Sequence, residues 1–262
     1  MVLELSESML MAALRAWWWP FLRISGFLLT APIIGTRALP RRVRVLLALA
    51  LTLVLAPSVK LDAAIAALEP LSAAGLLVVV QQITIGAALG LVLRMVFVVF
   101  EFAGQVIAQQ MGLGFAAMVD PQSGMQVPVI SQFYVVLATL LFFASNAHLQ
   151  LIRLLADSFT LLPVGASIGR DMLAEIMRWS GELLVLAVML MLPTVIALLV
   201  VNLVFAVMTR SAPQLNIFAI GFPVTLLCGV LMMLLTIPSL EHDITAALRA
   251  GFTAAYALLE QK

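Results

Sequence analysis

Six long apolar runs constrain the fold of this chain more than any other feature. They cover roughly residues 9–35, 43–59, 71–100, 127–151, 183–208 and 218–240. About 20 consecutive apolar residues are enough to cross a bilayer as a helix, and a helix satisfies its backbone hydrogen bonds internally. Only 10% of the residues are charged, whereas soluble domains carry about 25%. We therefore predict an all-α protein, integral to a membrane or assembled at one, with about six long, kinked helices packed as helical hairpins.

The sequence has no signature of an enzyme or of a nucleic-acid-binding protein. The net charge is +1, and no basic face with interleaved aromatic residues is present to follow a phosphate backbone. The chain has 2 histidines and 1 cysteine, without metal-ligand spacing or a glycine-rich phosphate loop. We therefore expect no catalytic residues, no metal and no cofactor. Because no linker rich in serine, glycine or charge divides the chain, we also predict a single domain over residues 1–262.

The basic residues do not support a simple membrane topology. The positive-inside rule would make the densest basic cluster cytoplasmic, and this cluster is Arg37, Arg41, Arg42 and Arg44. Strict alternation then places most other basic residues on the opposite side: Lys60, Arg153, Arg170, Arg178, Arg249 and Lys262. Because the charge bias cancels, we expect that some helices do not face lipid.

Three adjacent tryptophans interrupt the first apolar run. Trp17, Trp18 and Trp19 stand next to Pro20, a pattern typical of an aromatic anchor at the membrane interface. A packing surface for another subunit is the alternative.

Two further segments are amphipathic. Acidic and basic side chains recur at helical spacing from Asp171 to Glu182. If that helix continues through residues 183–208, it has about 40 residues and is about 60 Å long. Either Pro193 breaks it or it extends beyond a bilayer. The tail from Glu241 to Lys262 places apolar residues on one face, as in a docking helix or an interfacial helix; these residues are Ile244, Leu248, Phe252, Ala255 and Leu259.

The segment from Gly104 to Pro128 is unusual for a connection between apolar runs. It is apolar, rich in glycine and methionine, and has no Lys or Arg. Non-helical backbone at membrane depth is tolerated only where protein or a water-filled cavity surrounds it. We therefore expect this segment to face a conduit or a partner, whereas Asp120 and Pro121 are typical of a loop end or helix cap.

Several short motifs resemble those of one known family. One is QQMGLGF at Gln109–Phe115, followed by DPQSG from Asp120, and another runs from Asn202 to Pro223. Further matches follow the same order along the chain: PFLR from Pro20, APII from Ala31, PVISQF from Pro128 and LFFASNAH from Leu141. Together they resemble the FliR/SctT family of type III secretion export-gate subunits. Met111 favours the flagellar branch, because the virulence counterparts tend to have arginine there. Asn146-Ala-His departs from the commoner Asn-Gly-His.

The resemblance implies a structural and gating subunit of the flagellar protein export channel. It implies a non-catalytic protein that assembles with FliP-like and FliQ-like subunits in a helical, funnel-like complex and adjoins an FlhB-like protein. The cargo would be unfolded flagellar proteins, and the location would be the bacterial inner membrane, among lipid, at the flagellar basal body. Two alternatives remain: a virulence export-gate subunit, or a stand-alone solute or ion transporter, for which Glu101 is the only plausible buried acid.

The resemblance also implies a loop that helps to plug the closed pore. Its residues here would be Gln110, Met111, Gly112, Leu113, Gly114 and Phe115. Methionine is adaptable, glycine permits unusual backbone turns, and an apolar constriction can close a pore by excluding water. A second set is expected to form a helix break and pack against partner subunits, together with Asp120 and Pro121: Arg210, Pro213, Asn216, Gly221 and Pro223.

Overall fold

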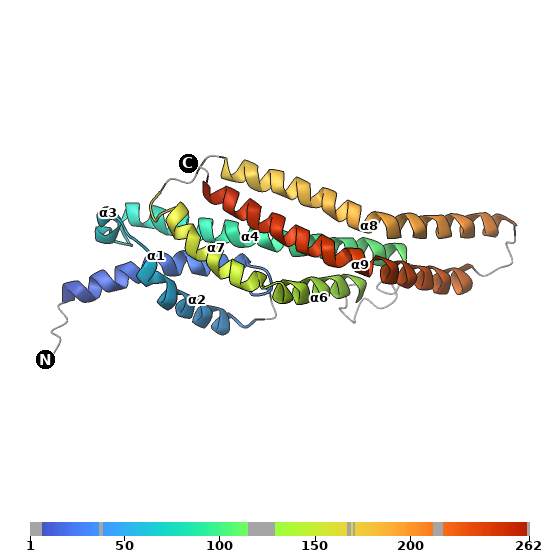
Figure 1. Cartoon of the computed structure of the whole chain (residues 1–262), viewed down its shortest axis with the longest axis horizontal. Coiled ribbons are helices and arrows are strands. Elements are labelled where there is room, and N and C mark those ends of the chain that lie inside the picture. Colours follow the sequence, from blue (N-terminus) through green and yellow to red (C-terminus); the bar gives the residue numbers. More distant parts are fainter. Residues whose placement is uncertain are drawn as a thin grey trace. The chain divides into compact units, whose positions relative to one another are not determined.

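Helices account for the secondary structure of the described chain, as the sequence predicts. The computed structural model describes residues 7–36, 39–114, 129–166, 169, 171–211 and 217–260, and these ranges contain no strand. The helices, shown in Figure 1, are α1 (Glu7–Thr30), α2 (Arg41–Leu55), η1 (Ala56–Ser58), α3 (Ala63–Ala67), α4 (Ala73–Gln110), α6 (Val129–Ala144), α7 (Ala147–Leu161), α8 (Met172–Ser211) and α9 (Ile217–Glu260).

The chain forms two compact units. The first unit comprises Met1–Met95, Asn146–Trp179 and Arg249–Lys262, and the second comprises Val96–Ser145 and Ser180–Leu248. The borders fall inside α4, α8 and α9, so each of these helices contributes to both units. Between α6 and α7 the border coincides with a helix break at Asn146, which has a left-handed φ of 55°. Asparagine is one of the few residues that adopts this conformation readily.

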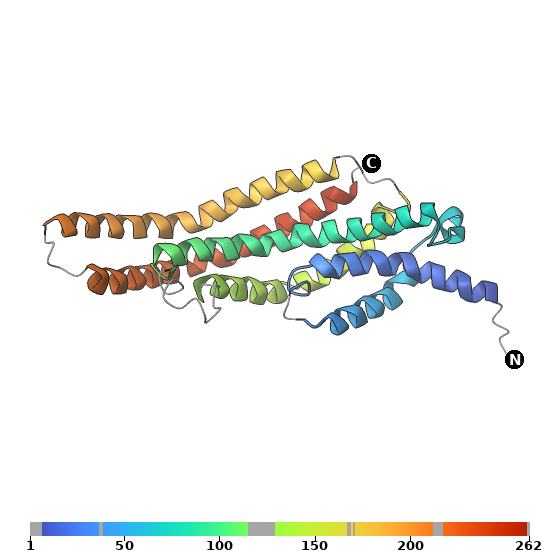
Figure 2. The same ribbon diagram turned by 180° about the vertical axis from the view of Figure 1, so that it is seen from behind.

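The core of the first unit is built where α1 and α4 approach closely, side by side in Figure 2. A Cβ atom on Gly26 would lie 2.5 Å from the carbonyl oxygen of Ile83. On α4, a Cβ on Gly86 would overlap the carbonyl oxygen of Arg23 and lie 2.8 Å from the nitrogen of Phe27. Small residues let helix backbones pack this closely. The Thr30 hydroxyl completes the contact by donating to the carbonyl of Ala87 at 2.8 Å.

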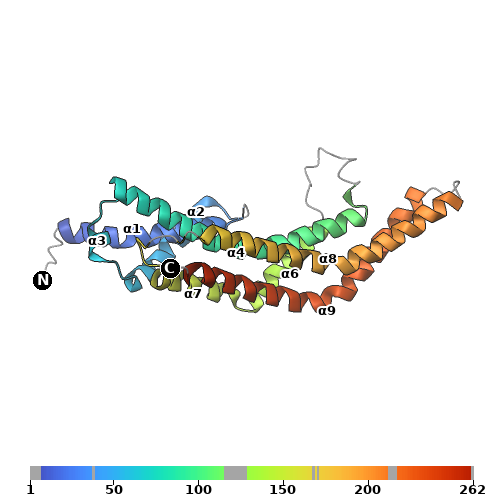
Figure 3. The same ribbon diagram turned by 90° about the horizontal axis from the view of Figure 1, so that it is seen from above.

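The second unit packs the end of α4 against α6. The Ser131 hydroxyl donates to the carbonyl of Glu101 at 2.8 Å, and a Cβ on Gly104 would lie 2.7 Å from the Cα of Ser131. The rings of Phe97 and Phe142 meet edge to face, 5.7 Å apart. The remaining parts of α8 and α9 run as an antiparallel hairpin in this unit (Figure 3).

Three of these helices, α4, α8 and α9, are long and apolar enough to cross a membrane. If α6 and α7 together form one broken span, the number of candidate spans rises to four. The sequence offers all six apolar runs as candidate spans, and among the described residues α1 and α2 do not meet this criterion of length and composition. Helix α2 has only 15 residues, fewer than the approximately 20 that cross the hydrocarbon layer. The first run carries Arg23, which is completely buried.

Helix lengths differ from the sequence-based boundaries at the end of α4 and at the tail, and agree with one of the two alternatives for α8. The segment Gly104–Pro128 does not begin as a connection, because α4 continues to Gln110. Helix α8 has 40 residues and continues through Pro193, which leaves an overlong helix as the correct alternative. The tail is no separate helix, since α9 runs for 44 residues to Glu260. The predicted apolar face of the tail is nevertheless correct, because all of its five residues are buried: Ile244, Leu248, Phe252, Ala255 and Leu259.

Candidate functional site

The predicted plug segment begins with a well-defined helix end in the second unit. The N–H of Leu113 donates to the carbonyl of Ala108 at 3.1 Å, and the N–H of Gly112 donates to that of Gln109 at 3.0 Å. Gly112 has a positive φ of 83°. This pair of hydrogen bonds with a left-handed glycine is the Schellman motif that ends many helices. The glycine therefore fixes the direction in which the chain leaves α4.

The structure places five of the six predicted plug residues. Gln110 is the last residue of α4 and is half-buried. Met111 is buried, with 1% of its surface exposed. Gly112 and Leu113 are half-buried and Gly114 is exposed. Phe115 lies outside the described residues. None of the five carries a charge, so this turn can contribute to an apolar constriction.

Helix α9 holds the start of this turn. The Thr225 hydroxyl donates to the carbonyl oxygen of Met111 at 3.3 Å. The Met111 side chain fills the space above Gly229, where a Cβ atom would lie 2.5 Å from the Met111 Cγ. A Cβ on Gly112 would lie 3.3 Å from the ring of Phe222. The predicted plug is thus anchored at its first residues to one helix of the same unit.

The described members of the second predicted set lie in α8 and α9, and their packing against partner subunits stays a prediction. Helix α8 ends at Ser211, and Arg210 is exposed in its last turn. The negative end of the helix dipole stabilises a cation at this position. Gly221 and Pro223 lie inside α9 and not in the break. Pro223 is the seventh residue of α9 and cannot donate a backbone hydrogen bond to the carbonyl four residues earlier, yet the helix continues past it. Asp120, Pro121, Pro213 and Asn216 lie outside the described residues.

Arg23 is a buried polar centre that the sequence analysis did not assign. In the first unit its Nε donates to the Gln82 Oε1 at 2.7 Å, and its Nη1 donates to the Ser158 carbonyl at 2.6 Å. The guanidinium lies 4.4 Å from the centre of the Phe159 ring. Ser158 is in the last turns of α7, where the helix dipole stabilises a cation. The available signal was an arginine within an apolar run, one of two in residues 9–35, but its partners are remote in sequence.

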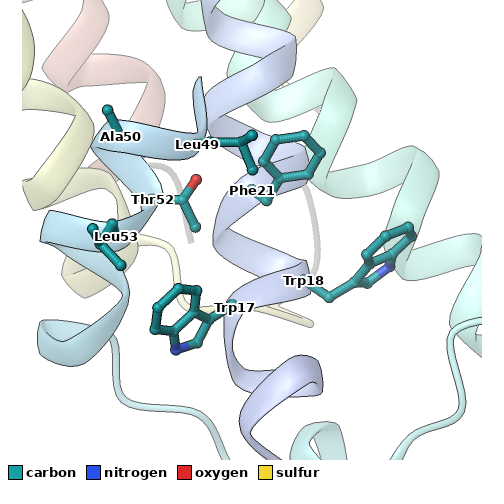
Figure 4. A pocket seen from close by; sticks show the side chains of 7 residues that line it. All are labelled: Trp17, Trp18, Phe21, Leu49, Ala50, Thr52 and Leu53. Carbon is teal, nitrogen blue, oxygen red and sulfur yellow. The ribbon is translucent and has the colours of Figure 1, made fainter. Parts of the chain in front are cut away.

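The tryptophan run is divided between core and surface in the first unit. Trp19 is completely buried, whereas Trp17 and Trp18 are 45% and 43% exposed. An apolar groove of about 450 Å³ lies between α1 and α2, lined by Trp17, Trp18, Phe21, Leu49, Ala50, Thr52 and Leu53. In Figure 4, Trp17 points toward α2 beside Leu53, and Trp18 points away from α2. Only the first two tryptophans are therefore available for the membrane anchor or subunit contact considered from the sequence.

Metal binding and proton transport can be checked against the acidic, histidine and cysteine side chains of the described residues. Among the described residues, no group of three or more His, Cys, Asp or Glu side chains is placed to hold a metal. Glu101, on which the transporter alternative depends, is exposed on α4. A proton-coupled transporter would need an acid enclosed at the substrate path, so this alternative is not favoured.

Comparison with known proteins identifies the family. Residues 14–250 match the family model described as "Bacterial export proteins, family 1". The chain is 40% identical to the flagellar biosynthetic protein FliR of Pectobacterium carotovorum, over 84% of this chain and 83% of the relative. It is 38% identical to FliR of Escherichia coli K12, over 90% of each protein. It is also 32% identical to FliR of Aquifex aeolicus, over 83% of each. This chain therefore belongs to family 1 of the bacterial export proteins, with FliR proteins of flagellar biosynthesis among its relatives.

Proposed function

We propose that the segment Gln110–Phe115, which begins at the last residue of α4, is a seal of the closed flagellar export gate. The chain is a membrane-embedded subunit of the flagellar type III export apparatus and works in a complex with other components of that apparatus. This much follows from the match over residues 14–250 and from relatives that share up to 40% identity with it. What the family match leaves open is which part of the chain closes the path for ions.

The observation that carries the proposal is the anchored, uncharged turn at the end of α4. Met111 is buried, and Gly112 turns the chain out of the helix at a φ of 83°. Beyond it, Leu113 is half-buried and Gly114 is exposed. An apolar ring excludes water and ions, because a narrow apolar constriction dewets. The same constriction can yield to an unfolded protein chain, since no ion pair has to break.

The partners that fit this role are FliP-like and FliQ-like subunits and an FlhB-like protein. The support is the large apolar surface that the second unit leaves exposed. Only 17% of the most apolar stretch of α8 is buried, and only 22% of the most apolar stretch of α9 is buried. Both helices therefore need lipid or other apolar helices around them. We place the complex in the inner membrane at the flagellar basal body, with unfolded flagellar proteins as cargo. The residues proposed to pack against these partners are Asp120, Pro121, Arg210, Pro213, Asn216, Gly221 and Pro223. Residues 1–262 act as one domain.

Deletion of Met111–Phe115 tests the sealing role. We expect the assembled gate to become permeable to ions and small solutes, measured as flux into vesicles that contain the purified complex. Co-purification of the other gate subunits checks assembly. An assembled gate that remains as tight as the wild type would show that the seal lies elsewhere.

A milder variant keeps the anchored residues in place. Leu113→Asn hydrates the turn without touching Met111 or α9, so we expect a smaller leak. The matched control is Leu71→Asn, because Leu71 is 89% exposed and also lies outside the helices. Equal leaks from the two variants would argue against a specific seal at Leu113.

A further inference from the structure

We propose that Gly229 of α9 is the seat of a releasable latch, into which Met111 packs while the export gate is closed. The inference rests on the proposed sealing role of the turn after α4. It adds a second element, since α9 would hold the seal shut and its movement would release it.

The shape of the contact shows why this position is a glycine. A Cβ atom on Gly229 would lie 2.5 Å from Cγ, 2.6 Å from Sδ and 2.7 Å from Cε of Met111. All three distances are far below the usual carbon contact distance of about 3.5–4.0 Å. The whole outer part of the methionine side chain therefore occupies the volume that any larger residue would need. Met111 is 1% exposed as a result.

The neighbouring contacts lie on the same face of α9. Phe222, Thr225 and Gly229 are spaced by three and then four residues, which places them on one side of a helix. The Phe222 ring lies 3.3 Å from the place that a Cβ on Gly112 would take, and Thr225 donates to the carbonyl oxygen of Met111. One face of one helix thus contacts the side chain, the carbonyl and the next residue of the turn.

Each of these contacts can be released at small cost. The Thr225 hydroxyl also lies 3.0 Å from the carbonyl oxygen of Phe222, so it keeps a partner when Met111 leaves. Methionine is unbranched and adapts its shape through three side-chain torsions. No ion pair and no backbone hydrogen bond between α4 and α9 is part of this contact in the described residues. A latch of this kind opens without unfolding either helix.

Gly229→Leu is the direct test. The larger side chain must displace Met111, so we expect the assembled gate to leak ions several-fold more than the wild type. The matched control is Gly181→Leu on α8, because a Cβ on Gly181 would have no atom within 4 Å. A Gly229→Leu gate that assembles and is as tight as the control would overturn the latch.

A second substitution tests whether the effect arises from Met111. In the double variant Met111→Ala/Gly229→Leu, the shorter residue 111 makes room for the leucine, so we expect less leak than from Gly229→Leu alone. Such non-additivity is the mark of two side chains in contact. A double variant that leaks as the sum of its two single variants would contradict the pairing.

Assembly and the proposed function are controlled separately. If Gly229→Leu does not assemble, Gly229→Ala serves as the test, because its methyl group still overlaps Met111. We expect the Gly229→Ala gate to leak more ions than the wild type. A Gly229→Ala gate as tight as the wild type would overturn the latch. If deletion of Met111–Phe115 leaks but the Gly229 variants are tight, the latch is wrong and the seal stands. If the deletion itself is tight, the sealing role is wrong.

Discussion

Two glycines in this chain lie in similarly close contacts with different kinds of atom, one with backbone atoms and the other with a side chain. In the first unit, Gly86 of α4 faces backbone atoms of α1, with a Cβ position 2.8 Å from the nitrogen of Phe27. In the second unit, the three atoms nearest to a Cβ on Gly229 of α9 all belong to the side chain of Met111. Backbone atoms in a helix cannot move without moving the helix, whereas the end of a methionine side chain can rotate away. The first contact is therefore a fixed joint, and the second can be released.

The polar groups follow the same division. The fixed joint of the first unit is accompanied by the completely buried Arg23, which binds both α4 and α7. The releasable contact has one hydrogen bond, from the Thr225 hydroxyl at 3.3 Å. Buried charge–dipole contacts are costly to break, while a single neutral hydrogen bond contributes only about 1 kcal/mol. We therefore expect substitutions in the two regions to affect different properties of the protein.

The largest effect is expected from Gly86→Ala. The added methyl group overlaps the Arg23 carbonyl and would force α1 and α4 apart, at a cost of about 3 kcal/mol or more. The measurement is the yield and thermal unfolding of the purified complex, compared with Gly229→Ala. Equal stability of the two variants would remove the distinction between a fixed and a releasable contact.

Arg23→Ala should have the next largest effect on stability. It leaves the Gln82 amide oxygen and the Ser158 carbonyl without their charged donor, which we expect to destabilise the first unit by about 2–3 kcal/mol. Thermal unfolding in detergent measures this loss. Ion flux through whatever gate still assembles should stay at the wild-type level, and a leak without loss of stability would place Arg23 in the gate itself.

Thr225→Val should have the smallest effect. The isosteric side chain loses the hydrogen bond to the Met111 carbonyl, at a cost of about 1 kcal/mol. We expect a slight increase in ion flux through the assembled gate and a smaller fall in the unfolding temperature than Arg23→Ala causes. The control is Thr84→Val on α4, because the Thr84 hydroxyl is exposed and bonds only within its own helix. A stability loss as large as that of Arg23→Ala would show that Thr225 belongs to a fixed joint as well.

The sequence was sufficient for the helices and insufficient for their contacts. Apolar periodicity predicted the buried face of the tail, and the charged start of α8 predicted a helix of about 40 residues. The same patterns missed the continuation of α4 to Gln110, because Gly104 is a weak helix former whose local preference tertiary packing overrides. The partners of Arg23 and Met111 could not be predicted, since Gln82, Ser158 and Gly229 are remote in sequence. Periodicity indicates which face of a helix is buried, but not which residues of another helix pack against that face.

The central claim is that Gln110–Phe115 seals the gate while Met111 is seated at Gly229, and that Met111 leaves this seat during export. A disulfide tests it directly in the variant Met111→Cys/Gly229→Cys, with Cys228→Ser to remove the native thiol. A Cβ at residue 229 would lie 2.5 Å from the Cγ of Met111, so the two Cβ atoms can come within the about 3.5–4.5 Å that a disulfide requires. We predict that the oxidised gate is tight to ions and exports no flagellar protein, and that a reductant restores export. Export at an unchanged rate through the cross-linked gate would contradict the account.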